Sequence, residues 1–350
     1  MKIIRFPFYS LIIGVTAVLL SSCTTMLYTS IDVLRPASVT FPVEVEDVVI
    51  VNNTLPQPHE MGHITELFGE HPKKHIIDTD SLPLFHLAAL AQAMTGKEFF
   101  NTVKVDTQSS NKGEFFFSPT PPSDSTIKIL RNRHKTNAVL SLNRIMVNDH
   151  VAEMYNQESG TFTAYIEAKY EMQWSIHFTE LNKTYPLVIR DTVYWESESQ
   201  VRLQALKGLP NRRDALIDGA LITGERSLNR FIPYWEKEDR YFFNSNNDLM
   251  KAGIDSVYVR NWNGAIDQWN ELLVKSKNNM LKAKTAFNIA VAYEIQGEYE
   301  KALSFADEAN ENMMNVAMLD VNSFVTINQY YEKLRTRVEE MRQVRKQLGE

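Results

Sequence analysis

The sequence predicts two folded domains in series: an α/β domain in which helices cover a mixed sheet, then an all-α domain of packed helices. First, strand-like and helix-like segments alternate from residue 44 onward, which is typical of a sheet covered by helices. Second, the hydrophobic period returns to 3.6 after Glu198, and the chain beyond the following linker is helical. Third, the chain has 350 residues, 44% hydrophobic and 23% charged, enough for two cores in an ordinary globular composition.

Residues 1–22 have the pattern of a secretory signal peptide. A basic start and an apolar run over 11–20 are followed by small residues directly before Cys23, the only cysteine in the chain. The apolar run is too short to span a bilayer. The ending Leu-Ser-Ser-Cys at residues 20–23 resembles a bacterial lipobox, which implies cleavage before Cys23 and acylation of that residue. An ordinary signal peptide followed by a chance cysteine is the alternative.

The residues after Cys23 indicate where the acylated protein resides. Thr24 stands where Asp would retain a lipoprotein of this pattern, so the resemblance favours the outer membrane of a bacterial cell envelope. Residues 25–28 lack the acidic run that marks surface export in some envelope lipoproteins, so we expect the periplasmic face. The rest of the chain contains no thiol and therefore no disulfide, and its stability must come from packing.

The charge balance excludes two kinds of partner. The formal net charge is −6, from 37 basic and 43 acidic residues, and no long basic stretch occurs. This argues against nucleic acid as a main ligand. It also argues against attachment to an anionic membrane surface by charge alone. The membrane contact that we expect is therefore the lipid on Cys23, which anchors stably only when several acyl chains are attached.

The first part of the mature chain is predicted element by element. Residues 23–43 form a lipidated, extended lead-in, because Pro36 and Pro42 exclude a helix. The α/β domain follows over residues 44–232, with apolar or alternating runs as strands and capping Asp or Ser residues at helix starts. The expected strands are 46–52, 99–105, 139–145, 161–178 and 184–195, and the expected helices are 81–95, 123 to about 131, and 211–231.

This order of elements predicts a mixed sheet with helices on at least one face. It resembles the small periplasmic α/β domain at the front of Tol-system TolB-type proteins and of curli-secretion lipoproteins. The resemblance covers residues 44–232 and implies a fold, not an activity.

Residues 233–247 are predicted to be the linker between the two domains. Aromatic residues flank this linker, and we expect them to pack the α/β domain against the first helices that follow. A ligand-facing aromatic patch is the alternative. The aromatic residues are Tyr234, Trp235, Tyr241, Phe242, Phe243, Trp262 and Trp269.

The C-terminal domain, over residues 248–350, contains a repeat. In the stretch 286–309, small residues recur where two antiparallel helices approach closely, and Gly297 allows a tight turn between them. A looser copy precedes it, with Gly253 and the stretch 262–265 at matching positions. The pattern resembles a tetratricopeptide repeat, which implies a helical groove for a protein or peptide partner. A helix pair that merely packs is the alternative.

One stretch matches a catalytic signature. His59-Glu60-Met61-Gly62-His63 has the form H-E-x-x-H, in which one helix turn of a zinc protease places both histidines toward the metal. The context argues against this, because prolines precede the stretch and Gly62 interrupts the turn. Four of the eight histidines fall between residues 59 and 75, so a loose metal site is an alternative to a solvated loop. No nucleophile elbow or phosphate-binding glycine loop occurs, and we predict no catalytic, metal-ligating or cofactor-binding residue.

The whole chain resembles an uncharacterised family of Bacteroidota-type envelope lipoproteins that join a TolB-like α/β domain to tetratricopeptide-like helices. The matching stretches are 48–53, 234–235, 264–269 and 290–294. We therefore expect a non-enzymatic interaction scaffold, anchored through Cys23, with a protein or peptide in the helical groove. A metal-dependent hydrolase of peptide or envelope polymer, using the His59/His63 loop, is the second hypothesis. A subunit of an envelope secretion assembly is the third.

Overall fold

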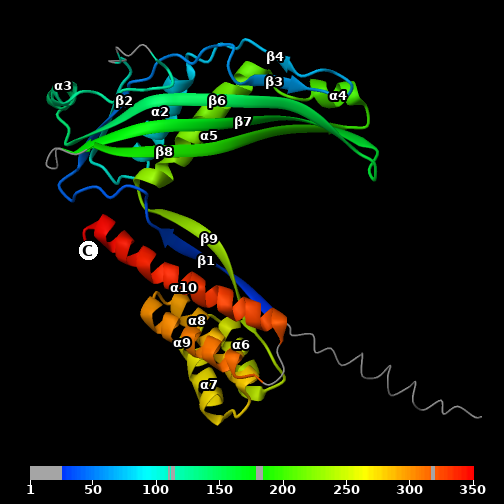
Figure 1. The fold of residues 1–350 in the computed structure, drawn as a ribbon. Helices are drawn as coiled ribbons and strands as arrows, with labels where there is room; N and C mark the ends of the chain where they lie inside the picture. Colours follow the sequence, from blue (N-terminus) through cyan, green and yellow to red (C-terminus); the bar gives the residue numbers. More distant parts are fainter. Residues whose placement is uncertain (1–25, 109–110, 112–114, 179–183, 317–319) are drawn as a thin grey trace, which may run out of the picture. The chain divides into compact units, whose positions relative to one another are not determined.

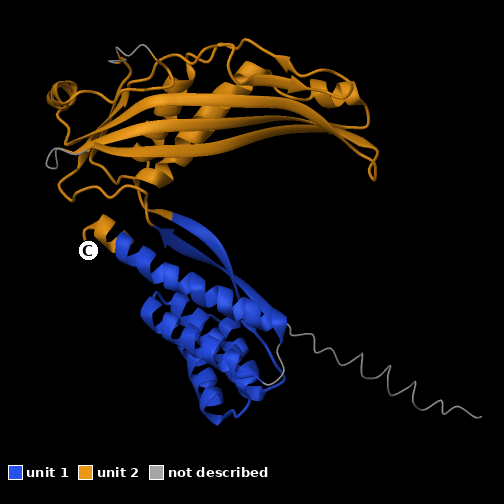
Figure 2. Cartoon of the chain, in the orientation of Figure 1, with its two compact units in different colours: residues 1–35, 235–343 blue, residues 36–234, 344–350 orange. Residues whose placement is uncertain are grey.

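The computed structural model describes residues 26–108, 111, 115–178, 184–316 and 320–350. The chain forms two compact units (Figure 2). The sheet unit comprises residues 36–234 and 344–350, and the helical unit comprises residues 1–35 and 235–343. The predicted fold class, an α/β region followed by a run of helices, is confirmed. The signal-peptide region 1–22 and Cys23 lie outside the described residues.

The sheet unit is built around a seven-stranded mixed sheet (Figure 1). Its first strand, β2 (Asp47–Asn52), is an apolar run, and it lies parallel to both β5 (Thr102–Asp106) and β6 (Ala138–Asn156). The four central residues of β2 are buried, as a strand covered on both faces requires. Because β6 is far longer than β2, the second half of β6 extends beyond it.

That second half of β6 pairs in parallel with β3 (His63–Glu66), which is joined antiparallel to the short β4 (Lys73–Lys74). On its other side β6 pairs along its whole length with β7 (Thr161–Phe178), and β7 pairs with β8 (Thr184–Ser199), both antiparallel. Among the described strands, β8 pairs only with β7, so it is an edge of the sheet.

Helices cover both faces of this sheet. Figure 1 shows α2 (Leu82–Thr95) and α5 (Arg212–Phe231) crossing the same face of the long strands, where the main core lies. The short α4 (Arg202–Lys207) precedes α5. The opposite face of β2 packs against α3 (Asp124–His134), which buries Ile127 and Leu130 there.

Among its described residues, the helical unit combines a two-stranded ribbon with five helices. The ribbon pairs β1 (Met26–Arg35) with β9 (Tyr234–Phe243). Asparagine side chains at positions 247, 261 and 278 accept backbone N–H groups at the starts of three helices, which explains where those helices begin. The helices are α6 (Asp248–Tyr258), α7 (Trp262–Lys275), α8 (Asn279–Ile295), α9 (Tyr299–Met314) and α10 (Val321–Leu348).

Small residues account for the close packing of these helices. Ala290, Ala302 and Ala309 are fully buried, and the turn between α8 and α9 uses Gly297 at a φ of 79°. In the earlier helix pair, a Cβ on Gly253 would lie 2.0 Å from Nε1 of Trp269. The absent side chain of Gly253 therefore makes room for the tryptophan.

Two stretches differ from the sequence-based expectation. The linker predicted over 233–247 contains strand β9, and the lead-in predicted over 23–43 contains strand β1, its partner. Strand β9 contains five consecutive charged residues at 236–240, and each strand pairs with a segment about 200 positions away, so local patterns do not reveal them. The aromatic residues Tyr241, Phe242 and Phe243 pack among the helices of the helical unit.

The sheet unit should lose stability as the pH falls, because of His86. This residue is buried between α2 and α5, with its Nδ1 atom 3.2 Å from Oγ1 of Thr223. Burial lowers its pKa from 6.5 to about 4. Between those values the unfolded chain binds a proton that the folded chain does not, so His86 reduces stability by about 2 kcal/mol from pH 7 to pH 5.

Urea unfolding of the wild type and of His86→Gln, each at pH 7 and pH 5, measures this contribution. The variant should show a smaller loss of stability on acidification. The control His71→Gln, on an exposed loop, should behave like the wild type. Equal losses in all three proteins would refute the assignment to His86.

Candidate functional site

The histidines of the H-E-x-x-H stretch do not converge. His59 lies in a loop, with its Nε2 atom 2.9 Å from Oδ1 of Asp80. His63 begins strand β3, is buried, and bonds through Nδ1 to Asp149 of β6. Gly62, between them, has a φ of 86°, which is not helical. The helix turn that would aim both rings at one zinc ion is therefore not formed.

His63 is instead part of a buried ionic cluster. The Asp149 carboxylate also accepts a hydrogen bond from Nε of Arg212 at 2.5 Å. The same guanidinium donates to the carbonyl of Ile64 at 2.9 Å and to the hydroxyl of Thr65 at 3.1 Å. This cluster fixes the start of α5 against β3 and β6, which is a structural role.

Within the described residues, one group of side chains could hold a metal ion: His59, Asp78 and Asp80, whose ligand atoms lie within 4.8 Å of one another. The hydrogen bond that the His59 ring donates to the Asp80 carboxylate raises the pKa of His59. Asp78 also lies 3.5 Å from Nη2 of Arg213. The two carboxylates are exposed, so a cation bound there would keep most of its water.

A groove of about 540 Å³ lies in the helical unit beside strand β1. Five consecutive residues of β1, Thr29–Val33, line it. Successive side chains of a strand point to opposite faces, so a continuous run means that the backbone edge of β1 borders the groove. The turn at 295–297 and the aromatic residues Trp235, Trp262 and Tyr299 line the groove as well.

A buried ion pair lies beneath this groove. Arg240 of β9 donates two hydrogen bonds, of 2.7 and 2.6 Å, to the carboxylate of Glu294 on α8. The hydroxyl of Tyr330 on α10 donates a third, at 2.8 Å. Burial by itself lowers the pKa of Arg240, but the hydrogen bonds and charge of Glu294 outweigh it and raise the pKa. The Arg240 guanidinium therefore stays charged, and its hydrogen bonds join β9, α8 and α10.

Strand β9 occupies the adjoining face of α8. The side chain of Asn288 accepts a hydrogen bond from the Phe243 amide at 2.8 Å and donates one to its carbonyl at 2.7 Å. The ring of Tyr241 stacks on Phe287, with 5.3 Å between centroids. This face of the helices therefore already holds an extended segment of the chain itself, and the open groove lies beside β1.

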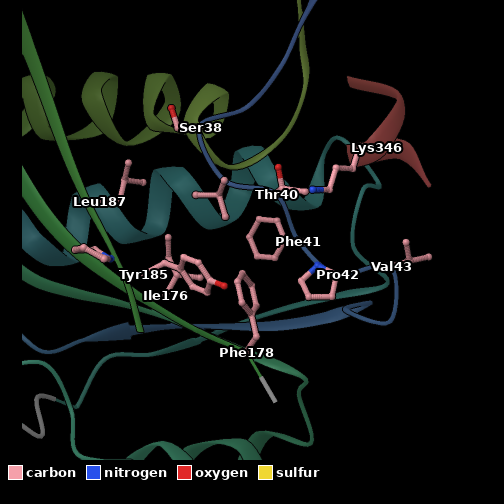
Figure 3. A pocket seen from close by; sticks show the side chains of 12 residues that line it. Ser38, Thr40, Phe41, Pro42, Val43, Ile176, Phe178, Tyr185, Leu187 and Lys346 are labelled. Carbon is pink, nitrogen blue, oxygen red and sulfur yellow. The ribbon is translucent and has the colours of Figure 1, made fainter. Parts of the chain in front are cut away.

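A second cavity, of about 540 Å³, lies in the sheet unit (Figure 3). Its lining comes from the segment 38–43, from the end of β7, from residues 185–187 at the start of β8, and from Lys346 near the end of α10. The side-chain amide of Gln347 holds the first of these segments, because it bonds to the backbone of Ala37 in both directions at 3.0 Å.

Sequence reasoning identified few of these residues. Trp235 and Trp262 belong to the predicted aromatic cluster, and both line the groove. The β1 residues and Lys346 carry no local signal, because their role depends on segments about 200 to 300 positions away. Cys23, the predicted lipidation site, lies outside the described residues. Across the part of the chain that is described, no helix has the length and apolarity needed to span a bilayer.

Comparison with known proteins gives family matches without an assigned activity. A family model described as Domain of unknown function (DUF8603) matches residues 45–243, and one described as Domain of unknown function (DUF6340) matches residues 251–336. No curated protein matches the chain.

Three solved structures are similar to it, each at 10% identity. One is titled an uncharacterized protein, with 53% of this chain and 93% of that chain covered and a TM-score of 0.24. Another is a putative neuraminyllactose-binding hemagglutinin homolog from Helicobacter pylori, with 55% and 87% covered and a TM-score of 0.25. The third is the hypothetical protein CT253 from Chlamydia trachomatis, with 51% and 97% covered and a TM-score of 0.22. At these TM-scores the titles imply nothing for this chain.

The ion pair beneath the groove gives a stability prediction. Glu294→Ala should lower the free energy of unfolding by about 3 kcal/mol, because it removes the two-bond carboxylate partner of the buried Arg240 guanidinium and leaves it only Glu238. The double variant Arg240→Met with Glu294→Leu should cost less, because it removes both charges. Denaturant unfolding of the three proteins tests this. A double variant less stable than Glu294→Ala would contradict it.

Proposed function

The chain belongs to the DUF8603 family of unknown function, and from that premise we propose that it is a lipid-tethered adapter that binds an extended segment of a partner protein. It acts without catalysis, cofactor or nucleic acid. It is held to the outer membrane of a Bacteroidota-type cell envelope through Cys23 and faces the periplasm.

The observation that carries the proposal is the backbone edge of β1 along the groove. Among the described strands β1 pairs only with β9, so its second edge has no strand partner there, although Arg337 donates a hydrogen bond to the Leu34 carbonyl at the end of β1. An extended peptide placed there gains main-chain hydrogen bonds from the strand, and its alternate side chains enter the adjoining pockets. The groove length, five residues of β1, suits a short segment of a partner protein.

The groove also supplies contacts that select the peptide. The side chain of Trp235 is 68% exposed, which is unusual for so large an apolar group, and Trp262 and Tyr299 lie in the same groove. Aromatic side chains at such positions provide most of the binding energy in many interfaces. Arg260, which lines the groove, has no ion-pair partner among the described residues. Asp32 lines the same groove and is likewise without an ion-pair partner among the described residues, so we expect a partner segment with apolar side chains and charged groups of both signs.

The lipid tether rests on the sequence pattern before Cys23. Acylation places the chain at a bilayer surface, and the high local concentration that results favours binding of a partner held in the same membrane. An adapter of this kind needs no catalytic group. The proposal is consistent with His59 and His63 bonding to different carboxylates, Asp80 and Asp149, and not converging on one metal ion.

The peptide-binding proposal is tested with peptides selected by display against the full chain. A selected peptide is then resynthesised with one N-methyl group at each backbone position in turn. Strand addition uses every second N–H of the peptide, so N-methylation should weaken binding at alternate positions, by about tenfold each. Isothermal titration calorimetry measures the affinities.

Protein variants locate the site. Trp235→Ala should weaken peptide binding by about tenfold or more, because it removes an exposed aromatic contact. The control Val274→Ala, on an exposed position of α7 in the same unit, should leave the affinity unchanged. The absence of selectable peptides, or binding that is insensitive to both the alternate N-methyl groups and Trp235→Ala, would refute the adapter proposal.

The tether is tested separately. Cys23→Ser should abolish incorporation of labelled palmitate and move the protein from the envelope pellet to the soluble fraction, because no other acylation site of this pattern exists in the sequence. Retention of both label and pellet association in the variant would show that Cys23 is not the anchor.

A further inference from the structure

We propose that the cavity of the sheet unit binds a free fatty acid, with the acyl chain among aromatic and aliphatic side chains and the carboxylate on Lys346. This site is separate from the β1 groove and does not depend on the adapter function. Its volume of about 540 Å³ lies within the range of small-molecule sites, and its lining of mainly apolar groups with a few polar ones is typical of them.

The apolar part of the cavity is formed in advance. Phe178 lies between two other rings, with its centroid 5.4 Å from that of Phe41 and 5.3 Å from that of Tyr185. Phe41 and Phe178 are both buried, and Ile176 and Leu187 extend the same wall (Figure 3). An acyl chain needs no hydrogen bonds from such a wall, and each methylene that it buries there strengthens binding by removing apolar surface from water.

The polar end of the cavity suits one carboxylate. Figure 3 shows Lys346 extending from the C-terminal helix toward Thr40. Lys346 has no ion-pair partner among the described residues. The Thr40 hydroxyl accepts a hydrogen bond from Nε2 of Gln347 at 3.1 Å, so its own proton is available to donate. One ammonium and one hydroxyl match the charge and acceptor atoms of a single carboxylate.

The wall that carries Thr40 is fixed. Besides its two bonds to Ala37, the Gln347 amide donates to the carbonyl of Val39 at 3.1 Å. The backbone N–H of Val39 donates in turn to the carbonyl of Arg230 at 3.1 Å. A preformed wall reduces the ordering cost of binding.

A fatty acid fits this cavity better than a peptide strand does. The β8 edge is represented by only three residues, Tyr185, Pro186 and Leu187. Pro186 has no N–H to donate, so a strand added there would lack a regular row of hydrogen bonds. The Lys346 ammonium on the opposite wall would also lack a carboxylate partner in most peptides, whereas every fatty acid supplies one.

The test uses a photoreactive fatty acid, which is added to envelope vesicles from cells that express the full chain. The cofactors needed to incorporate the fatty acid into lipids are left out of the reaction. After irradiation, mass spectrometry should find the label on peptides that contain Phe41 or Tyr185. Leu187→Trp should reduce the labelling at least fivefold by filling the cavity. Circular dichroism confirms that the variant is folded.

Lys346→Glu tests the head group. It should reduce labelling by the acid about tenfold and leave labelling by the matching photoreactive alcohol unchanged. The control Lys207→Glu, on the exposed side of α4, should leave both unchanged. The proposal is overturned if label falls on other peptides, if Leu187→Trp labels like the wild type, or if Lys346→Glu affects acid and alcohol equally. Peptide-binding results do not bear on this outcome.

Discussion

The pairing of β1 with β9 is the constraint on which the helical unit depends. These strands lie at opposite ends of the sheet unit in sequence, so the helical unit is assembled from two separate parts of the chain. Arg35 at the end of β1 secures the pairing, with Nε 2.9 Å from Glu236 and Nη1 2.6 Å from Glu340 on α10. Without β1 the open groove would lose its main wall, and β9 would lose its only strand partner among the described residues.

The elements that were predicted well are those whose hydrophobic period can be read within one segment of the sequence. Strand β7 spans Thr161–Phe178, as the alternating pattern predicted, and α5 spans Arg212–Phe231, within one residue of the amphipathic helix expected there. Periodicity of two or 3.6 is readable in one segment. The ribbon strands were missed because their side chains are satisfied by a distant segment, as Glu238 shows. Burial alone would raise its pKa, but hydrogen bonds from Lys333 and Arg240 lower it to about 2.

The same reasoning explains why the candidate sites were not foreseen. The H-E-x-x-H stretch is visible in sequence, yet its meaning depends on backbone geometry, and the strand at His63 separates the two rings. The groove and the cavity instead combine residues with no local signature. Gln347 holds residues that precede it by about 310 positions, which no pattern within one segment can reveal.

The start of β1 at Met26 has a consequence for an anchor at Cys23. Three residue steps reach at most about 10 Å when fully extended. An acyl anchor at Cys23 would therefore hold Met26, the first residue of β1, within about 10 Å of the lipid. An acyl group on Cys23 would therefore restrain the start of β1 most closely, while the grooves formed by later residues could lie farther from the lipid.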